Sequence, residues 1–104
     1  MIVTTSLEVP GKKVKEIMGV VKGNTVRAKN VGRDIAAGFK NLVGGEIKSY
    51  TDLLAQAREE AYNRMVNEAI DKKADAVIGM RFMTSMVMAG SAEILAFGTA
   101  VKLK

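Results

Sequence analysis

The apolar and β-branched residues at the start of the chain are typical of β-structure. Residues 2–5 are all β-branched and are followed by Pro10-Gly11, which predicts a strand and then a turn. Residues 14–28 form a second extended stretch, with Gly19 as a candidate bulge and Gly23-Asn24 as a candidate turn. We therefore expect β-structure here, with the second stretch folded as a hairpin.

The period changes to three and four residues over positions 31–43. The apolar positions in this stretch are Ile35, Phe39, Leu42 and Val43. Asp34 lies near its start, and Gly44-Gly45 lies past its end, where helices favour a left-handed cap. This pattern predicts a short helix.

A longer helix is predicted from about Tyr50 to Lys73. Ser49 and Asp52 resemble a capping box at its start. A stripe of mostly small residues follows at helical spacing, namely Leu54, Ala57, Ala61, Met65 and Ala69. Small side chains of this kind suit close packing on a sheet or on a neighbouring helix.

After Asp75 the period returns to two, which predicts a C-terminal hairpin with its turn at residues 88–91 and its second strand over 93–103. In the first strand, one face is expected to carry Ala76, Ile78, Met80 and Phe82, and the other Val77, Gly79, Arg81 and Met83. In the second strand, one face carries Leu95, Phe97, Val101 and Leu103, and the other Ile94, Ala96, Gly98 and Ala100. Neither face is polar enough for contact with water.

This pattern indicates a homo-oligomer. An antiparallel sheet in a monomer normally has one apolar and one polar face. Two helices can cover one face of this sheet and little of the other. We expect the uncovered face to meet another copy of the chain through Met83, Val87, Ile94 and Ala96. An apolar pocket lined by adaptable methionines is the alternative.

The predicted elements define a single α+β domain over residues 1–104, in which an antiparallel sheet of N-terminal strands and the C-terminal hairpin is packed by one short and one long helix. The composition, 48% hydrophobic and 26% charged, is that of a globular protein. No stretch has the character of a signal peptide or a membrane span, and the chain has no cysteine. We expect a cytoplasmic protein without contact to a membrane.

The net charge of +5 arises at the N-terminal end. Residues 1–40 contain eight Lys or Arg against three acids, while residues 41–104 contain eight of each. A basic segment can attract nucleic acid or an acidic partner. Its basic residues also fit the exposed positions of an edge hairpin, where lysine discourages edge pairing: Lys12, Lys13, Lys15, Lys22, Arg27 and Lys29. We favour the interpretation that these residues lie on an exposed sheet edge, with binding of nucleic acid or an acidic partner as the alternative.

The absence of histidine and cysteine excludes thiolate and imidazole metal ligands and the nucleophile systems that depend on them. Glycine-rich nucleotide motifs are also missing. The acids of the long helix, Asp52, Glu59, Glu60 and Glu68, are interspersed with Arg and Lys, as on a solvated face. We therefore predict no enzymatic activity and identify no cofactor, although an oxygen-ligated Mg²⁺ or Ca²⁺ site between copies remains an alternative.

Arg81 is the most informative charge, because it falls in the middle of an apolar strand. If its face is buried in an oligomer, the guanidinium requires an anion. The candidate protein partners are Glu46 and Glu93, with an interface ion pair favoured over a bound ligand.

Several motifs together resemble the YbjQ-like proteins of bacteria and archaea. They are Gly44-Gly45-Glu46, Tyr50-Thr51, Ala57-Arg58, the run from Ala74 to Arg81, and Phe97-Gly98-Thr99-Ala100-Val101. The resemblance covers essentially the whole chain. It implies an α+β fold, a ring of copies that is expected to be pentameric, and a family label of heavy-metal binding without an established activity. In this chain a metal would have to bind methionine thioethers or carboxylates.

The family motif and the charge argument meet at four positions: Glu46, Tyr50, Arg58 and Arg81. We therefore take these four as candidate residues for an interface between copies or for a small ligand held between them.

Overall fold

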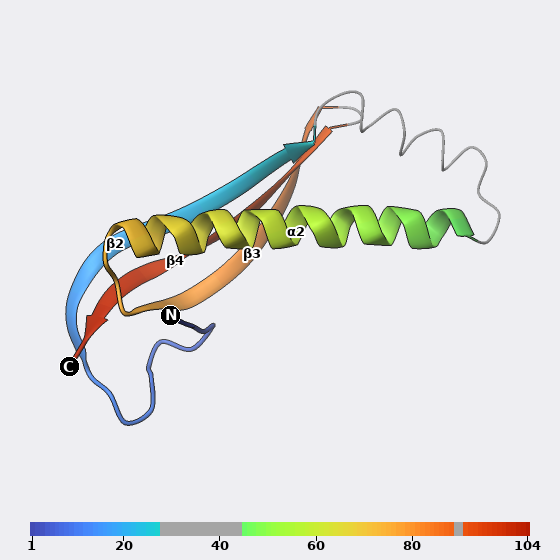
Figure 1. Cartoon of the computed structure of the whole chain (residues 1–104). Coiled ribbons are helices and arrows are strands. Elements are labelled where there is room, and N and C mark those ends of the chain that lie inside the picture. The colour runs from blue at the N-terminus through green and yellow to red at the C-terminus, as the bar shows by residue number, and fades with distance from the viewer. Residues whose placement is uncertain (28–44, 89–90) are drawn as a thin grey trace.

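The computed structural model describes residues 1–27, 45–88 and 91–104. Its elements are β1 (Ile2–Val3), β2 (Val14–Arg27), α2 (Gly45–Asp71), β3 (Ala76–Met88) and β4 (Ser91–Leu103). One sheet in the order β1-β3-β4-β2 lies against the long helix α2 (Figure 1). The α+β class is thus confirmed, and the short helix predicted over 31–43 lies outside the described residues.

The sheet is mixed, so the expectation of a wholly antiparallel sheet was wrong. β4 pairs antiparallel with both β2 and β3, but β1 pairs parallel with β3 in the register Ile2↔Ala76. Parallel neighbours need a long crossover, which β2 and α2 provide. Beyond β1 the chain stays on the edge of β3, because Thr4 N–H donates to Val77 O at 2.9 Å and Met80 N–H donates to Thr4 O at 3.0 Å.

β2 is one continuous strand at a sheet edge, not a hairpin. Its pairing with β4 passes through Gly23 and Asn24 without a break, so the predicted turn is wrong. The predicted bulge at Gly19 is confirmed, because Ile17 and Gly19 lie opposite the consecutive residues Val101 and Ala100.

β3 also contains a bulge, which the sequence pattern did not reveal. Its register with β4 shifts between Ile78 and Arg81, and Gly79 adopts a φ of 62°, a conformation that glycine adopts readily. The extra residue reverses the alternation of side chains. Val77 and Met80 therefore belong to the same buried cluster, although strict alternation had placed them on opposite faces.

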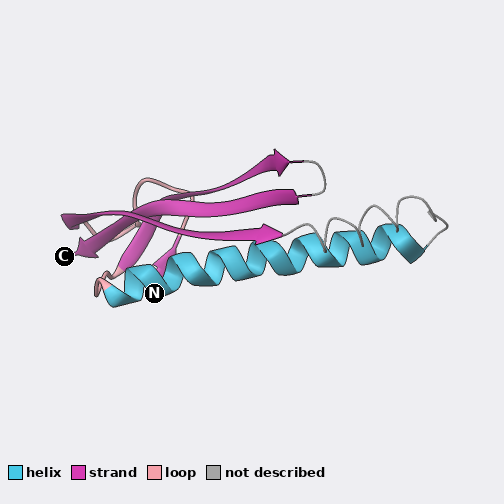
Figure 2. Cartoon of the chain, turned by 90° about the horizontal axis from the view of Figure 1, so that it is seen from above, coloured by secondary structure: helices cyan, strands magenta, loops and turns pink. Residues whose placement is uncertain are grey.

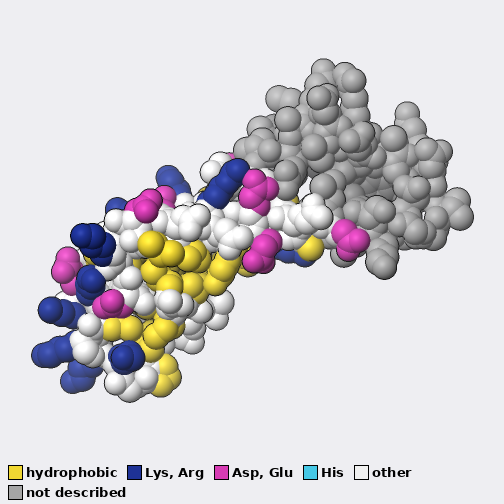
Figure 3. Space-filling model, in the orientation of Figure 1, with side chains coloured by type: hydrophobic (Ala, Val, Ile, Leu, Met, Phe, Trp, Pro, Cys, Tyr) yellow, Lys and Arg dark blue, Asp and Glu magenta, His cyan; other side chains and the backbone are white. Residues whose placement is uncertain are grey.

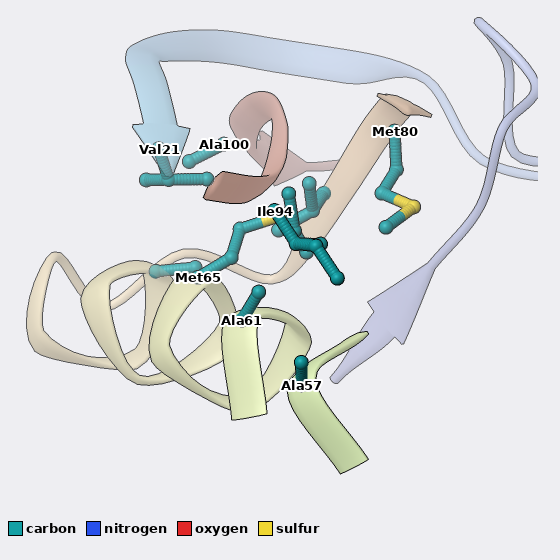
Figure 4. Packing of buried hydrophobic residues seen from close by; sticks show 10 residues of the cluster. Val21, Ala57, Ala61, Met65, Met80, Ile94 and Ala100 are labelled. Carbon is teal, nitrogen blue, oxygen red and sulfur yellow. The ribbon is translucent and has the colours of Figure 1, made fainter. Parts of the chain in front are cut away.

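α2 packs along one face of the sheet, mainly on β2 and β4 (Figure 2). The predicted stripe is confirmed, since Ala57, Ala61, Met65 and Ala69 are all completely buried. They join Val21, Ile94 and Ala100 from the sheet in the main core (Figure 4). The helix begins earlier than predicted, so Ser49 lies inside it and is not its cap.

At Gly23, β2 and α2 approach each other closely. A Cβ atom at this position would collide with Ala61 O and Met65 N and would lie 2.6 Å from Arg64 Cβ. Two hydrogen bonds beside it join the same elements: Arg64 Nη1 donates to Asn24 O at 2.6 Å, and the buried Thr25 hydroxyl donates to Ala57 O at 3.2 Å. The position of the helix is therefore set by backbone contact.

We predict that Gly23→Ala destabilises the fold by about 3 kcal/mol, because the added methyl group meets backbone atoms that cannot move independently. Lys22→Ala is the matched control, since Lys22 is exposed on the same strand. Urea unfolding of the two variants measures the difference, and equal midpoints would contradict the proposed close contact.

The C-terminus of α2 is closed by a Schellman motif with a lysine in the left-handed position. Lys73 N–H donates to Ile70 O at 2.8 Å, Ala74 N–H donates to Ala69 O at 3.0 Å, and Lys73 has a φ of 63°. Glycine is the usual residue at this position, because a Cβ atom is disfavoured in this conformation.

We therefore expect Lys73→Gly to raise the free energy of unfolding by about 0.5–1 kcal/mol. Lys73→Ala removes the same charge but keeps the Cβ atom, so it should bring no gain. Thermal unfolding of both variants separates the two effects, and a similar gain from alanine would show that charge, rather than backbone strain, limits stability here.

Candidate functional site

The sheet face opposite α2 is only partly covered. The N-terminal segment crosses one half of it, where Val9 packs with Ala76, Ile78 and Val101 in a second small cluster. The rest of this face, which we call the open face, carries the half-buried Leu95 and Phe97 and three strongly exposed side chains: Ile17 at 69%, Val20 at 66% and Met83 at 59%.

The open face is not the face that the sequence led us to expect. Ile94 and Ala96 pack beneath α2, so they cannot meet another copy. Of the predicted contact residues, Met83 lies on the open face, because it pairs with Leu95. Val87 has its side chain outside the described part of the structure. The sheet does have an uncovered apolar face, as predicted, but it is the face opposite the one that carries Ile94 and Ala96.

Arg81 lies on the open face in a row with two other residues. The strand registers place Lys22 on β2 and Arg81 on β3 on either side of Phe97 on the central strand β4. The Arg81 guanidinium donates to Thr5 O at 3.1 Å and to Met80 O at 2.9 Å. Within the described residues it forms no ion pair, so the predicted carboxylate partner is not supplied by the chain's own described side chains.

The other predicted site residues do not converge on Arg81. Glu93 accepts a hydrogen bond from the Asn24 side chain at 3.2 Å, four residues along β4 from the position opposite Arg81. Arg58 is exposed on α2, which packs on the opposite face of the sheet. Glu46 and Tyr50 belong to the first turns of α2, and their side chains lie outside the described part. Figure 2 shows that end of the helix reaching beyond the described strands.

The basic residues of the N-terminal segment do not form one surface. Lys12, Lys13 and Lys15 are exposed near the start of β2, while Lys22 lies further along the strand on the open face. The Arg27 side chain and Lys29 lie outside the described part. No helix among the described residues is long and apolar enough to cross a membrane.

The fold thus defines a two-layer α+β protein with one long helix on a four-stranded mixed sheet and one apolar sheet face partly uncovered. The family model for YbjQ proteins, described as "Putative heavy-metal-binding", matches residues 1–104. The chain belongs to this family.

Relatives named only as UPF0145 proteins cover nearly the whole chain. The protein from Methanoculleus marisnigri is 67% identical over 103 residues, covering 99% of this chain and 96% of its own length. Those from Thermotoga maritima and Psychromonas ingrahamii are 61% and 59% identical over 104 residues, covering 98% and 99% of their own lengths. The predicted family resemblance is confirmed, and these names indicate no activity.

A solved structure supports the fold. It is the crystal structure of a protein of unknown function in the DUF74 family from Pediococcus pentosaceus, with a TM-score of 0.66 and 19% sequence identity. The match covers 100% of this chain and 98% of that one.

The described side chains do not fit the heavy-metal site that the family description names. Thiolate and imidazole are absent from the whole chain, and among the described residues no three acids lie together as a metal site would require. Met65 and Met80 are buried in the core among aliphatic neighbours (Figure 4), where they serve as packing.

We predict that tenfold excess Zn²⁺ or Cd²⁺ leaves the melting temperature unchanged within about 1 °C, since a ligand that binds the native state tightly raises it. Native mass spectrometry of the same samples should show no stoichiometric metal adduct after desalting. A retained metal ion in each copy would contradict this prediction.

Proposed function

We propose that the protein is a cytoplasmic, non-enzymatic homo-oligomer whose copies meet across the open face and hold a small anion beside Arg81. Five copies in a ring is the assembly that the family resemblance implies. The observation that carries the proposal is the apolar sheet face that the described part of the chain leaves uncovered, on which Ile17, Val20 and Met83 are strongly exposed.

The exposed side chains of the open face support association between copies. Ile17 and Val20 project from β2 and Met83 projects from β3 on the same face of the sheet, and Leu95 and Phe97 lie on β4 between these two strands. Burying such a surface against another protein surface is favourable at about 25 cal/mol per Å² of apolar area, before the entropic cost of association is subtracted.

Arg81 and Lys22 support the bound anion. Covering the open face removes water from two cations that flank Phe97, and a buried charge without a partner is strongly destabilising. The described part of the chain supplies Arg81 with two backbone carbonyls but no carboxylate. The negative charge therefore comes from a neighbouring copy or from a small carboxylate or phosphate ligand.

Met83→Glu tests the assembly. A carboxylate placed in an apolar interface should weaken association at least a hundredfold, equivalent to about 2.7 kcal/mol. Asn67→Glu, on the exposed side of α2, adds the same charge away from the open face and should leave the mass unchanged. Sedimentation velocity measures both variants. A wild-type protein that sediments as a monomer, or equal loss in both variants, would contradict the proposed interface.

Arg81→Met tests the anion. Native mass spectrometry of the wild-type oligomer, purified without a tag, should reveal a reproducible added mass that the variant loses. Arg58→Met, in which an exposed helix arginine is removed, should retain it. If all three proteins form oligomers without an added mass, the proposed anion is contradicted, whereas the proposed assembly is not.

A further inference from the structure

One end of the molecule gathers lysines from three segments that are distant in sequence. We call it the basic end and define it by residues 12–16, 71–75 and 102–104. Its lysines are Lys12, Lys13, Lys15, Lys72, Lys73, Lys102 and Lys104. All except Lys102 are exposed, and Figure 3 shows Lys and Arg side chains crowded at this end of the protein.

Backbone hydrogen bonds fix the three segments to one another. Lys104 N–H donates to Lys13 O at 2.8 Å, which joins the first segment to the third. Leu103 N–H donates to the Asp75 carboxylate at 2.8 Å, and Asp75 N–H donates to Val101 O at 2.9 Å. The fold therefore holds the three lysine-containing segments next to one another.

The acids of this end leave most of its positive charge uncompensated. They are Glu16, Asp71 and Asp75, so seven lysines and three acids account for four of the chain's five net positive charges. Within these three described ranges, Asp75 and Lys102 form the one ion pair, at 3.8 Å between partly exposed groups. Ion pairs between exposed groups interact only weakly. This pair therefore leaves most of the positive charge at this end uncompensated.

The fold accounts for only part of this cluster. Lys72 and Lys73 follow the last turn of α2, where the helix dipole favours positive charge. That argument does not extend to the five lysines from the other two segments. Lys73 also occupies a left-handed position that glycine would adopt with less strain, so a lysine stands there at some cost to stability.

We propose that the basic end binds the phosphate backbone of nucleic acid without reading its sequence. Lysine is a compact point charge that binds phosphate without fixed geometry. The three ranges contain no arginine and no aromatic residue, the side chains that usually read bases or stack on them. The expected binding is therefore electrostatic and independent of sequence.

The same composition argues against a membrane surface. Peripheral membrane sites combine lysine with Trp, Phe or Leu side chains that enter the lipid. The apolar residues of these ranges are Val14, Ala74 and Leu103, and Leu103 packs against the second core cluster. The exposed apolar surface at this end is thus small, whereas the charge is large.

Fluorescence anisotropy with a labelled 25-base-pair duplex of mixed sequence tests the proposal on the full chain. Binding at 50 mM KCl with a dissociation constant of about 10⁻⁵ M should weaken at least tenfold at 200 mM KCl, as counterion release by about three phosphate contacts requires. A second duplex of unrelated sequence should bind equally well.

Two variants with the same change in net charge locate the surface. Lys13→Glu with Lys104→Glu alters the basic end and should weaken binding at least tenfold. Gln56→Glu with Arg58→Glu and Asn63→Glu alters exposed positions of α2, away from the basic end and the open face, and should change it less than threefold. Circular dichroism and sedimentation of both variants establish that fold and assembly are retained.

Three outcomes would overturn the proposal: no binding at 50 mM KCl, equal loss in the two variants, or binding that does not depend on salt. Binding to vesicles with anionic lipid but not to the duplex, lost in the basic-end variant, would also overturn it and assign the surface to membranes. None of these outcomes depends on whether the open face mediates assembly.

Discussion

The contact between the backbone of β2 at Gly23 and the alanine face of α2 determines how the rest of the protein is arranged. Because no side chain separates the strand from Ala61 and Met65, the helix lies directly on β2 and β4. α2 in that position covers one face of the sheet and leaves β3 near its margin. Within the described part of the chain, the apolar side chains of the opposite face then depend on the N-terminal segment, where Val9 packs with Ala76, Ile78 and Val101.

The sequence predicted those features that follow from local periodicity. The stripe from Ala57 to Ala69, the C-terminal hairpin and the bulge at Gly19 depend on spacing or on single residues, and all three are present. Gly79 shows why the faces could not be predicted. One extra residue in a strand exchanges the two sides for every residue beyond it, and no local signal distinguished this glycine from one that continues the strand.

Gly23 also shows what local sequence could not predict. Next to Asn24 it has the local character of a turn, but its role is to admit a helix forty residues away in sequence. Likewise, Arg81 was correctly singled out as a cation on an apolar strand, yet its neighbours Lys22 and Phe97 become visible only from strand pairing. The gathering of lysines at the basic end also depends on contacts between the two ends of the chain.

The order of the strands has a consequence for how the protein folds during its synthesis. β4 lies between β2 and β3 and follows both in the sequence, so β2 has no partner in the described sheet until β4 has been synthesised. Pairs such as Val14↔Leu103 join residues that are far apart in the sequence, and contacts of such long range slow folding. α2 can form earlier from local contacts, but its alanine face gains a binding surface only when β4 completes the sheet. The nascent chain therefore exposes its apolar strands until β4 has been made, a period in which net positive charge limits aggregation.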